Sequence, residues 1–109
     1  MREELECFDL DAEISDSESH KPWPAGKYAK TLVKKNNLRV VLFTMESGSA
    51  IKEHQAGGSI IVQVLRGEIR FRTQDREQKL RKGEILMLGP AIAHAVESVG
   101  DCAFLLTIS

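Results

Sequence analysis

Residues 48–67 read Gly48-Ser-Ala-Ile-Lys-Glu-His54-Gln-Ala56-Gly-Gly-Ser-Ile60-Ile-Val-Gln-Val-Leu-Arg-Gly67, and this stretch decides the fold. A second stretch follows a similar plan, because residues 83–98 read Gly83-Glu-Ile-Leu-Met-Leu-Gly89-Pro90-Ala91-Ile-Ala-His94-Ala-Val-Glu-Ser98. Each stretch opens with a Gly and carries one His. The run from Glu68 to Thr73 lies between them and alternates polar with apolar residues, as a strand of a β-hairpin does.

The first stretch resembles the first sequence motif of the cupin superfamily. In that motif a Gly is followed by His-x-His, then by a Glu, then by a second Gly. Gly48, His54 and Gly67 occupy their expected places. Ala56 stands where the second His belongs, and Ile60 stands where the Glu belongs.

The second stretch resembles the second cupin motif, which combines Gly, Pro-x-Gly, His and Asn. Gly83 and His94 are in register with it. The expected Pro, Gly and Asn are replaced, and a proline occurs one place late; the residues concerned are Gly89, Ala91, Ser98 and Pro90. Two motifs in the right order make the resemblance specific, and it is closest to small single-domain cupins with a conserved barrel.

The resemblance covers roughly Leu38 to Ile108 and implies an all-β fold, a cupin-type double-stranded β-helix or jelly-roll barrel. Strand-like alternation and turn residues recur at short intervals from Lys27 onward, which independently favours a closed or sandwiched antiparallel architecture. We expect strands at 28–33, 38–45, 49–54, 59–65, 68–73, 78–80, 84–88, 94–98 and 103–108. The Lys34-Lys35-Asn36-Asn37 sequence predicts a hairpin turn, because Asn tolerates positive φ.

Composition divides the chain into an acidic N-terminal arm, residues 1–26, and a barrel domain, residues 27–109. The arm is rich in Asp and Glu and has few apolar anchors, so we expect it to be loosely held. Its apolar residues could still pin part of it to the barrel or to a neighbouring subunit; they are Leu5, Phe8, Leu10 and Ile14.

The charge balance argues against nucleic acid as a partner. Charged residues make up 28% of the chain, yet the formal net charge is −1, which offers no field to attract a polyanion. The apolar runs are too short to cross a membrane. Two cysteines and no secretory leader predict free thiols in a reducing cytoplasm.

The candidate site residues are Lys52, His54 and His94. Strict alternation would place Lys52, His54 and Ala56 on one face of their strand, with Ile51 and Glu53 on the other. In cupins the motif histidines point into the barrel and bind a divalent metal, usually with three His and one Glu. Lys52 could supply a cation for an acidic ligand, and His94 could exchange a proton with it.

The resemblance supplies at most two ligands, His54 and His94, for a divalent transition metal. Catalytic zinc takes three protein ligands, and non-haem iron takes two His and a carboxylate. The nearby carboxylates, Glu53 and Glu97, have the wrong strand parity unless a bulge turns them. A complete metal site, a weakly bound ion and no metal all remain open.

Two classes of function follow. The first is a small cupin that binds or senses a small molecule in the barrel without a complete metal site. The second is a metal-dependent enzyme of the dioxygenase, isomerase or decarboxylase type that uses His54 and His94. Fold alone does not choose between them.

The apolar run from Ile60 to Leu65 predicts a strand that is buried on both faces. A second sheet, the arm or another subunit could cover its outer face. Since cupins commonly pair through such surfaces, we expect a homodimer.

Overall fold

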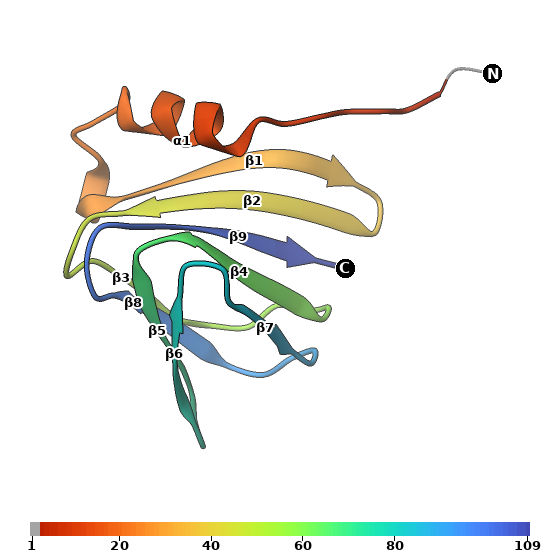
Figure 1. Ribbon diagram of the computed structural model, residues 1–109. Coiled ribbons are helices and arrows are strands. Elements are labelled where there is room, and N and C mark those ends of the chain that lie inside the picture. The colour runs from red at the N-terminus through yellow and green to blue at the C-terminus, as the bar shows by residue number, and fades with distance from the viewer. Residues whose placement is uncertain (1–2) are drawn as a thin grey trace.

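The structure, a computed structural model, describes residues 3–109, and its strands form two antiparallel sheets that face each other (Figure 1). The elements are α1 (Leu10–Glu18), a 3-10 turn (Pro24–Gly26), β1 (Lys27–Lys35), β2 (Leu38–Met45), β3 (Ala50–His54), β4 (Ile60–Arg66), β5 (Glu68–Thr73), β6 (Glu77–Arg81), β7 (Ile85–Leu88), β8 (His94–Ser98) and β9 (Cys102–Ile108). All nine expected strands are present, and the all-β jelly-roll prediction is confirmed.

The sheets have five and four strands, in the orders β1-β2-β9-β4-β7 and β3-β8-β5-β6. From β4 onward the chain crosses from one sheet to the other and back, so the two sequence motifs meet in space although a hairpin separates them. The Lys34–Asn37 turn joins β1 and β2 as predicted, with Lys35 opposite Leu38.

The core lies between the two sheets because strand alternation turns every second apolar side chain inward. On β4 the buried residues are Ile60, Val62 and Val64. Opposite them lie Ile69 and Phe71 of the second sheet. The remaining members of this core are Met45, Leu80, Val96, Cys102 and Phe104.

Gly67 closes the β4–β5 turn where another residue would not fit. Its φ is +72°, in the left-handed region that L side chains rarely adopt. A Cβ built on Gly67 would lie 2.2 Å from the carbonyl oxygen of Asp101. The close approach of these two backbones explains why a Gly stands at the end of the first motif.

The N-terminal arm is more ordered than the sequence suggested. Residues Leu10–Glu18 form helix α1, whose start is capped by the Asp9 side chain, which accepts a hydrogen bond from Ala12 N (3.1 Å). Ile14 is 2% exposed and packs against Leu42 and Ala103 on the outer face of the five-stranded sheet. The expectation of a loosely held arm is therefore wrong for α1, because one apolar side chain and several ion pairs fasten it. The division of the chain into two domains after residue 26 stays a prediction.

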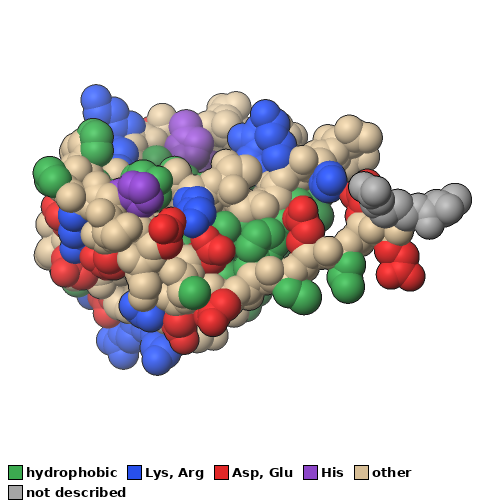
Figure 2. Space-filling model, turned by 90° about the horizontal axis from the view of Figure 1, so that it is seen from above, with side chains coloured by type: hydrophobic (Ala, Val, Ile, Leu, Met, Phe, Trp, Pro, Cys, Tyr) green, Lys and Arg blue, Asp and Glu red, His purple; other side chains and the backbone are tan. Residues whose placement is uncertain are grey.

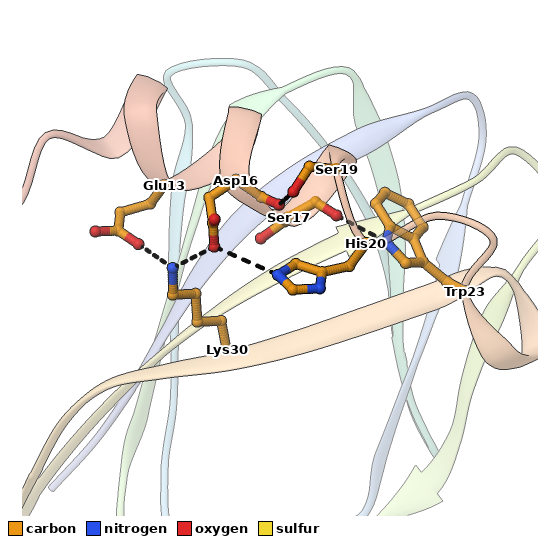
Figure 3. A network of polar contacts seen from close by, with 7 residues as sticks. All are labelled: Glu13, Asp16, Ser17, Ser19, His20, Trp23 and Lys30. Atoms are coloured by element: carbon orange, nitrogen blue, oxygen red, sulfur yellow. Dashed lines mark hydrogen bonds and ion pairs between the residues drawn. The ribbon is translucent and has the colours of Figure 1, made fainter.

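Polar contacts also hold α1 against β1 (Figure 3). The Lys30 ammonium lies 2.5 Å from Glu13 Oε1 and 2.8 Å from Asp16 Oδ2. The hydrogen bond and charge of Lys30 lower the pKa of the Asp16 carboxyl. Trp23 donates a hydrogen bond from its indole nitrogen to the Ser17 carbonyl (2.9 Å), so the chain folds back over the helix end.

Helix α1 covers only part of the outer face of β4. Leu65 is packed with Ile14, whereas Ile61 is 41% exposed. Helix α1 of the N-terminal arm therefore covers the part of this face around Leu65, and the part around Ile61 is exposed to solvent.

Acidic and basic side chains are interspersed on the face seen from above, where α1 lies (Figure 2). Neither the positively nor the negatively charged side chains form a broad patch on that face. In the described part of the chain, residues 3–109, no helix is long and apolar enough to cross a membrane.

Candidate functional site

His54 and His94 come together at the mouth of the barrel. They are direct partners in the β3–β8 ladder, and their ring centroids are 4.3 Å apart at an interplanar angle of 58°. His94 is 3% exposed and stacks on Phe71 (5.3 Å, 13°), whereas His54 is exposed. The pair thus joins a buried ring to one that solvent can reach.

A bulge in β3 places His54 on the inner side. The register shifts between Ile51, opposite Val96, and His54, opposite His94, so that two residues of β3 stand opposite one of β8. Ile51 packs on the core, and both Ile51 and His54 line the barrel interior. The predicted alternation, which set these two residues on opposite faces, is wrong because of this extra residue.

The two imidazoles are oriented by the backbone. Nδ1 of His54 lies 2.9 Å from the Lys52 carbonyl oxygen, and Nδ1 of His94 lies 2.9 Å from the Ile92 carbonyl oxygen. A carbonyl only accepts, so both Nδ1 atoms carry the proton. Each neutral ring therefore keeps the lone pair on Nε2.

A cavity of about 780 Å³ lies above the pair, within the usual size range of small-molecule pockets. Figure 1 shows its surroundings on the right, where the β1–β2 turn and the β3–β4 and β7–β8 loops gather. Both histidines line it, together with the apolar side chains of Val41, Phe43 and Leu106. The space beneath the pair is only about 20 Å³, enough for about one water, so a ligand has room at the mouth and not deeper in the barrel.

Cations from the β1–β2 hairpin stand at the rim of this cavity. Lys34 and Arg39 are direct cross-strand partners, and both are exposed and line the cavity. Lys35 lines it too, but its ammonium is paired with Glu4 at 3.1 Å. Of the cavity-lining residues that the structure describes, none is Asp or Glu.

Lys52 does not join the two histidines. It is exposed, lies in the bulge of β3 and lines none of the cavities described. The structure gives its backbone carbonyl a part in the site, as the partner of His54. The cations at the mouth are Lys34 and Arg39, which the motif did not indicate; the signal for them was the basic hairpin turn next to Arg39.

The donor set at the pair does not fit a classical cupin metal centre. Ile60, in the place of the motif carboxylate, is 1% exposed and belongs to the core, and Ala56 packs against it. Glu53 is exposed, and Glu97 faces Arg70 at 3.5 Å. Within residues 3–109 no three His, Cys, Asp or Glu side chains gather where they could hold a metal ion. A third protein ligand of the kind that zinc or iron takes is missing from this group.

Neither Cys7 nor Cys102 lines the cavity at the mouth. Cys102 is buried in the core, and burial raises the pKa of its thiol to about 12. It is therefore a small apolar residue rather than a nucleophile.

Several solved structures are similar to this chain. A cupin superfamily protein from Desulfitobacterium hafniense is 18% identical with a TM-score of 0.76, and the match covers 84% of each chain. A cupin 2 conserved barrel domain protein from Leptotrichia buccalis is 29% identical with a TM-score of 0.75, over 84% of this chain and 45% of that one. An RmlC-like cupin with a double-stranded β-helix fold from Methanocaldococcus jannaschii is 13% identical with a TM-score of 0.75, over 100% of this chain and 92% of that one.

No curated protein matches the chain significantly. The family model of the AraC-like ligand binding domain matches residues 39–109, which is more than half of the chain and includes both histidines. The chain is thus a small cupin domain, and it belongs to the AraC-like ligand-binding domain family.

Proposed function

We propose that this domain binds a small anionic molecule, such as a dicarboxylate, at the mouth of the barrel. The observation that carries the proposal is the Lys34–Arg39 pair, placed at the rim of a cavity that also holds His54 and His94 and has no acidic side chain in its lining. Membership of a ligand-binding family supports a small molecule as the partner.

Like charges directly opposite each other in an antiparallel ladder repel and are destabilising. Lys34 and Arg39 are such a pair. An anion between them would relieve the repulsion, and the guanidinium of Arg39 could hold a carboxylate through two parallel hydrogen bonds. The repulsion between Lys34 and Arg39 therefore favours an anionic ligand over a neutral or cationic one.

The rest of the cavity suits the other parts of such a molecule. Phe43 and Leu106 offer apolar walls for its carbon skeleton. The Nε2 atoms of His54 and His94 can accept a hydrogen bond when neutral and donate one when protonated. The histidines would thus orient a polar group at the floor while the cations hold the charged end.

Thermal shift against matched ligands tests this proposal. We expect malonate, succinate or glutarate to raise the melting temperature, by about 4 °C or more for the best of them at saturation, because a ligand that binds only the folded state stabilises it. The corresponding uncharged diamides have nearly the same shape and should produce no shift. Equal shifts from acids and diamides, or none from either, would overturn the proposal.

A metal-dependent enzyme is the second candidate, and one observation favours it. Both histidines donate Nδ1–H to a backbone carbonyl and keep Nε2 free, which is the arrangement found in most metal-binding histidines. With two imidazoles and no carboxylate, however, the residues do not make a classical site.

Chelation separates the two candidates. If the domain binds its ligand without a structural or catalytic metal, treatment with EDTA, followed by exchange into EDTA-free buffer, should leave its melting temperature and its dicarboxylate response unchanged. Elemental analysis of the untagged protein, with the His54→Ala/His94→Ala variant as control, supplies the comparison. About one transition-metal ion per chain, lost in the control, would favour the enzyme.

A further inference from the structure

The loop between β7 and β8, residues 89–93, holds one residue in a rarely adopted backbone conformation. Ala91 has a φ of +58°, in the left-handed region that residues with a side chain seldom occupy. Pro90 precedes it. A proline followed by a positive φ is the pattern of a type II turn, which normally has Gly or Asn at the second position. Ala91 occupies the place of the Gly in the second cupin motif, so the chain forms this turn with a residue that strains it.

One backbone hydrogen bond fastens this loop to the other side of the mouth. Ala91 donates its N–H to the Ala56 carbonyl oxygen at 2.9 Å. Ala56 lies in the β3–β4 loop, lines the cavity and packs against the core, so this acceptor is firmly placed. Within residues 3–109 no other backbone hydrogen bond joins the two loops. Because the backbone dihedral angles set the direction of an N–H, the conformation at Ala91 determines whether the loops stay together.

The residue after Ala91 holds the ring of His94. The Ile92 carbonyl oxygen lies 2.9 Å from Nδ1 of His94 and accepts its hydrogen bond. Ile92 is 42% exposed, so its own side chain anchors this carbonyl only weakly. The hydrogen bond of Ala91 lies one residue away and supplies the anchor. Because a hydrogen bond at one ring nitrogen selects the tautomer, His94 keeps its lone pair on Nε2.

An acceptor at the mouth favours a ligand with a hydrogen to donate. His94 is 3% exposed and lines the cavity, so a ligand that fills the mouth shuts Nε2 off from solvent. A carboxylate only accepts hydrogen bonds and would leave this nitrogen unpaired. A hydroxyl group would donate to it, and sites that hydrogen-bond a hydroxyl discriminate against ligands that lack one.

We propose that Ala91 is a positioning residue for His94, and that it thereby makes the mouth select dicarboxylates that carry a hydroxyl group. The left-handed turn fastens the loop to Ala56, the fastened loop holds the Ile92 carbonyl against Nδ1, and Nε2 remains an acceptor. Ala91 does not itself line the cavity, so it acts through the backbone. The preference for a hydroxyl rests on the proposed anion site, whereas the tautomer of His94 is a property of the free domain.

Nuclear magnetic resonance of isotope-labelled imidazole rings tests the positioning role in the full chain without ligand, at about pH 8, where histidine is ordinarily neutral. Nitrogen chemical shifts report which ring nitrogen carries the proton, and we expect Nδ1 for His94 of the wild type. Ala91→Val should move most of the population to the Nε2–H tautomer, because a β-branched residue is strained at positive φ and the turn opens. Ala91→Gly should keep the wild-type tautomer, because Gly adopts this φ freely.

Ala25→Val is the matched control, because Ala25 is also an exposed alanine with a positive φ (+53°). It lies in the 3-10 turn Pro24–Gly26 and does not line the cavity. Both valine variants should lower the melting temperature, but Ala25→Val should leave the tautomer of His94 unchanged. Hydrogen exchange needs no substitution. In the wild type the Ala91 amide should exchange at least about tenfold more slowly than that of Gly57, which donates no such hydrogen bond among the described residues.

Calorimetric titration with malate and succinate tests the ligand preference, since the two acids differ by one hydroxyl group. We expect the wild type and Ala25→Val to bind malate about tenfold more tightly than succinate, which is the effect of one added hydrogen bond. In Ala91→Val this ratio should fall to about threefold or less, because only His54 then offers an acceptor.

The outcomes separate the positioning role from the anion site. A wild-type His94 that carries its proton on Nε2, or a tautomer that Ala91→Val does not change, would overturn the positioning role. Equal affinity of the wild type for malate and succinate would overturn the hydroxyl preference. If the tautomers are as expected but neither acid binds, the anion site and the preference that rests on it are wrong, and the positioning of His94 by Ala91 is confirmed.

Discussion

Replacing Ile14 with alanine should lower the free energy of unfolding by about 2–5 kcal/mol. Ile14 is 2% exposed and stands between α1 and the outer face of the five-stranded sheet, against Leu42 and Ala103. Alanine has the higher helix propensity, so the substitution removes packing and costs the helix nothing else. Urea unfolding followed by circular dichroism measures the change.

Leu5→Ala is the control for this experiment. Leu5 also belongs to the N-terminal arm but is 81% exposed, so its truncation should change the stability by no more than about 0.5 kcal/mol. If Ile14→Ala were as neutral as Leu5→Ala, α1 would not be fastened to the barrel. The two variants together therefore measure how much of the arm belongs to the folded unit.

Reversing both cations at the mouth, Lys34→Glu with Arg39→Glu, should weaken dicarboxylate binding by about a hundredfold or more. A hydrogen bond to a charged group contributes about 1.5–3 kcal/mol, and a glutamate adds repulsion where the cation attracted. Because both positions are exposed, solvent screening keeps each contribution toward the lower end of that range. Calorimetric titration with the dicarboxylate that gives the largest thermal shift provides the affinity.

Lys79→Glu/Lys82→Glu changes the net charge of the chain by the same amount at two exposed positions that do not line the cavity. We expect this variant to bind within about twofold of the wild type, because charges beyond a Debye length are largely screened. If it lost affinity as strongly as the double reversal at the hairpin, the field of the whole chain would explain the binding, and the Lys34–Arg39 site would be wrong.

Sequence alone predicted the barrel well, for a physical reason. Alternation along each strand and turn residues between strands are local signals, and they survive in the tertiary structure because one face of each strand is buried. Helix α1 was missed since it has nine residues and many Asp and Ser side chains, and a helix so short is unstable without packing. Its local signal was Asp9, which caps the helix; its stability comes from Ile14 and Lys30, whose partners are remote in sequence.

The residues that the structure groups at the mouth of the barrel were predicted only in part. The cupin resemblance identified His54 and His94, and the structure brings these two together. Lys52 was assigned from regular alternation, which the β3 bulge breaks. Lys34 and Arg39 could not be assigned to the site without knowing that the β1–β2 hairpin extends to the mouth of the barrel.

The extra residue in the β3 bulge bears on two separate features of His54, namely the side of the sheet that it faces and the orientation of its ring. In a chain shortened by one residue at Glu53, Ile51 and the histidine would be two places apart, and ordinary alternation would keep both on the barrel side with His54 still opposite His94. The extra residue is therefore not needed to turn His54 toward the barrel interior or to pair it with His94. What the bulge does contain is Lys52, whose carbonyl oxygen lies 2.9 Å from Nδ1 of His54. The extra residue therefore lies next to the backbone group that orients the imidazole, and an insertion or deletion here would act on that contact rather than on the side of the sheet that His54 faces.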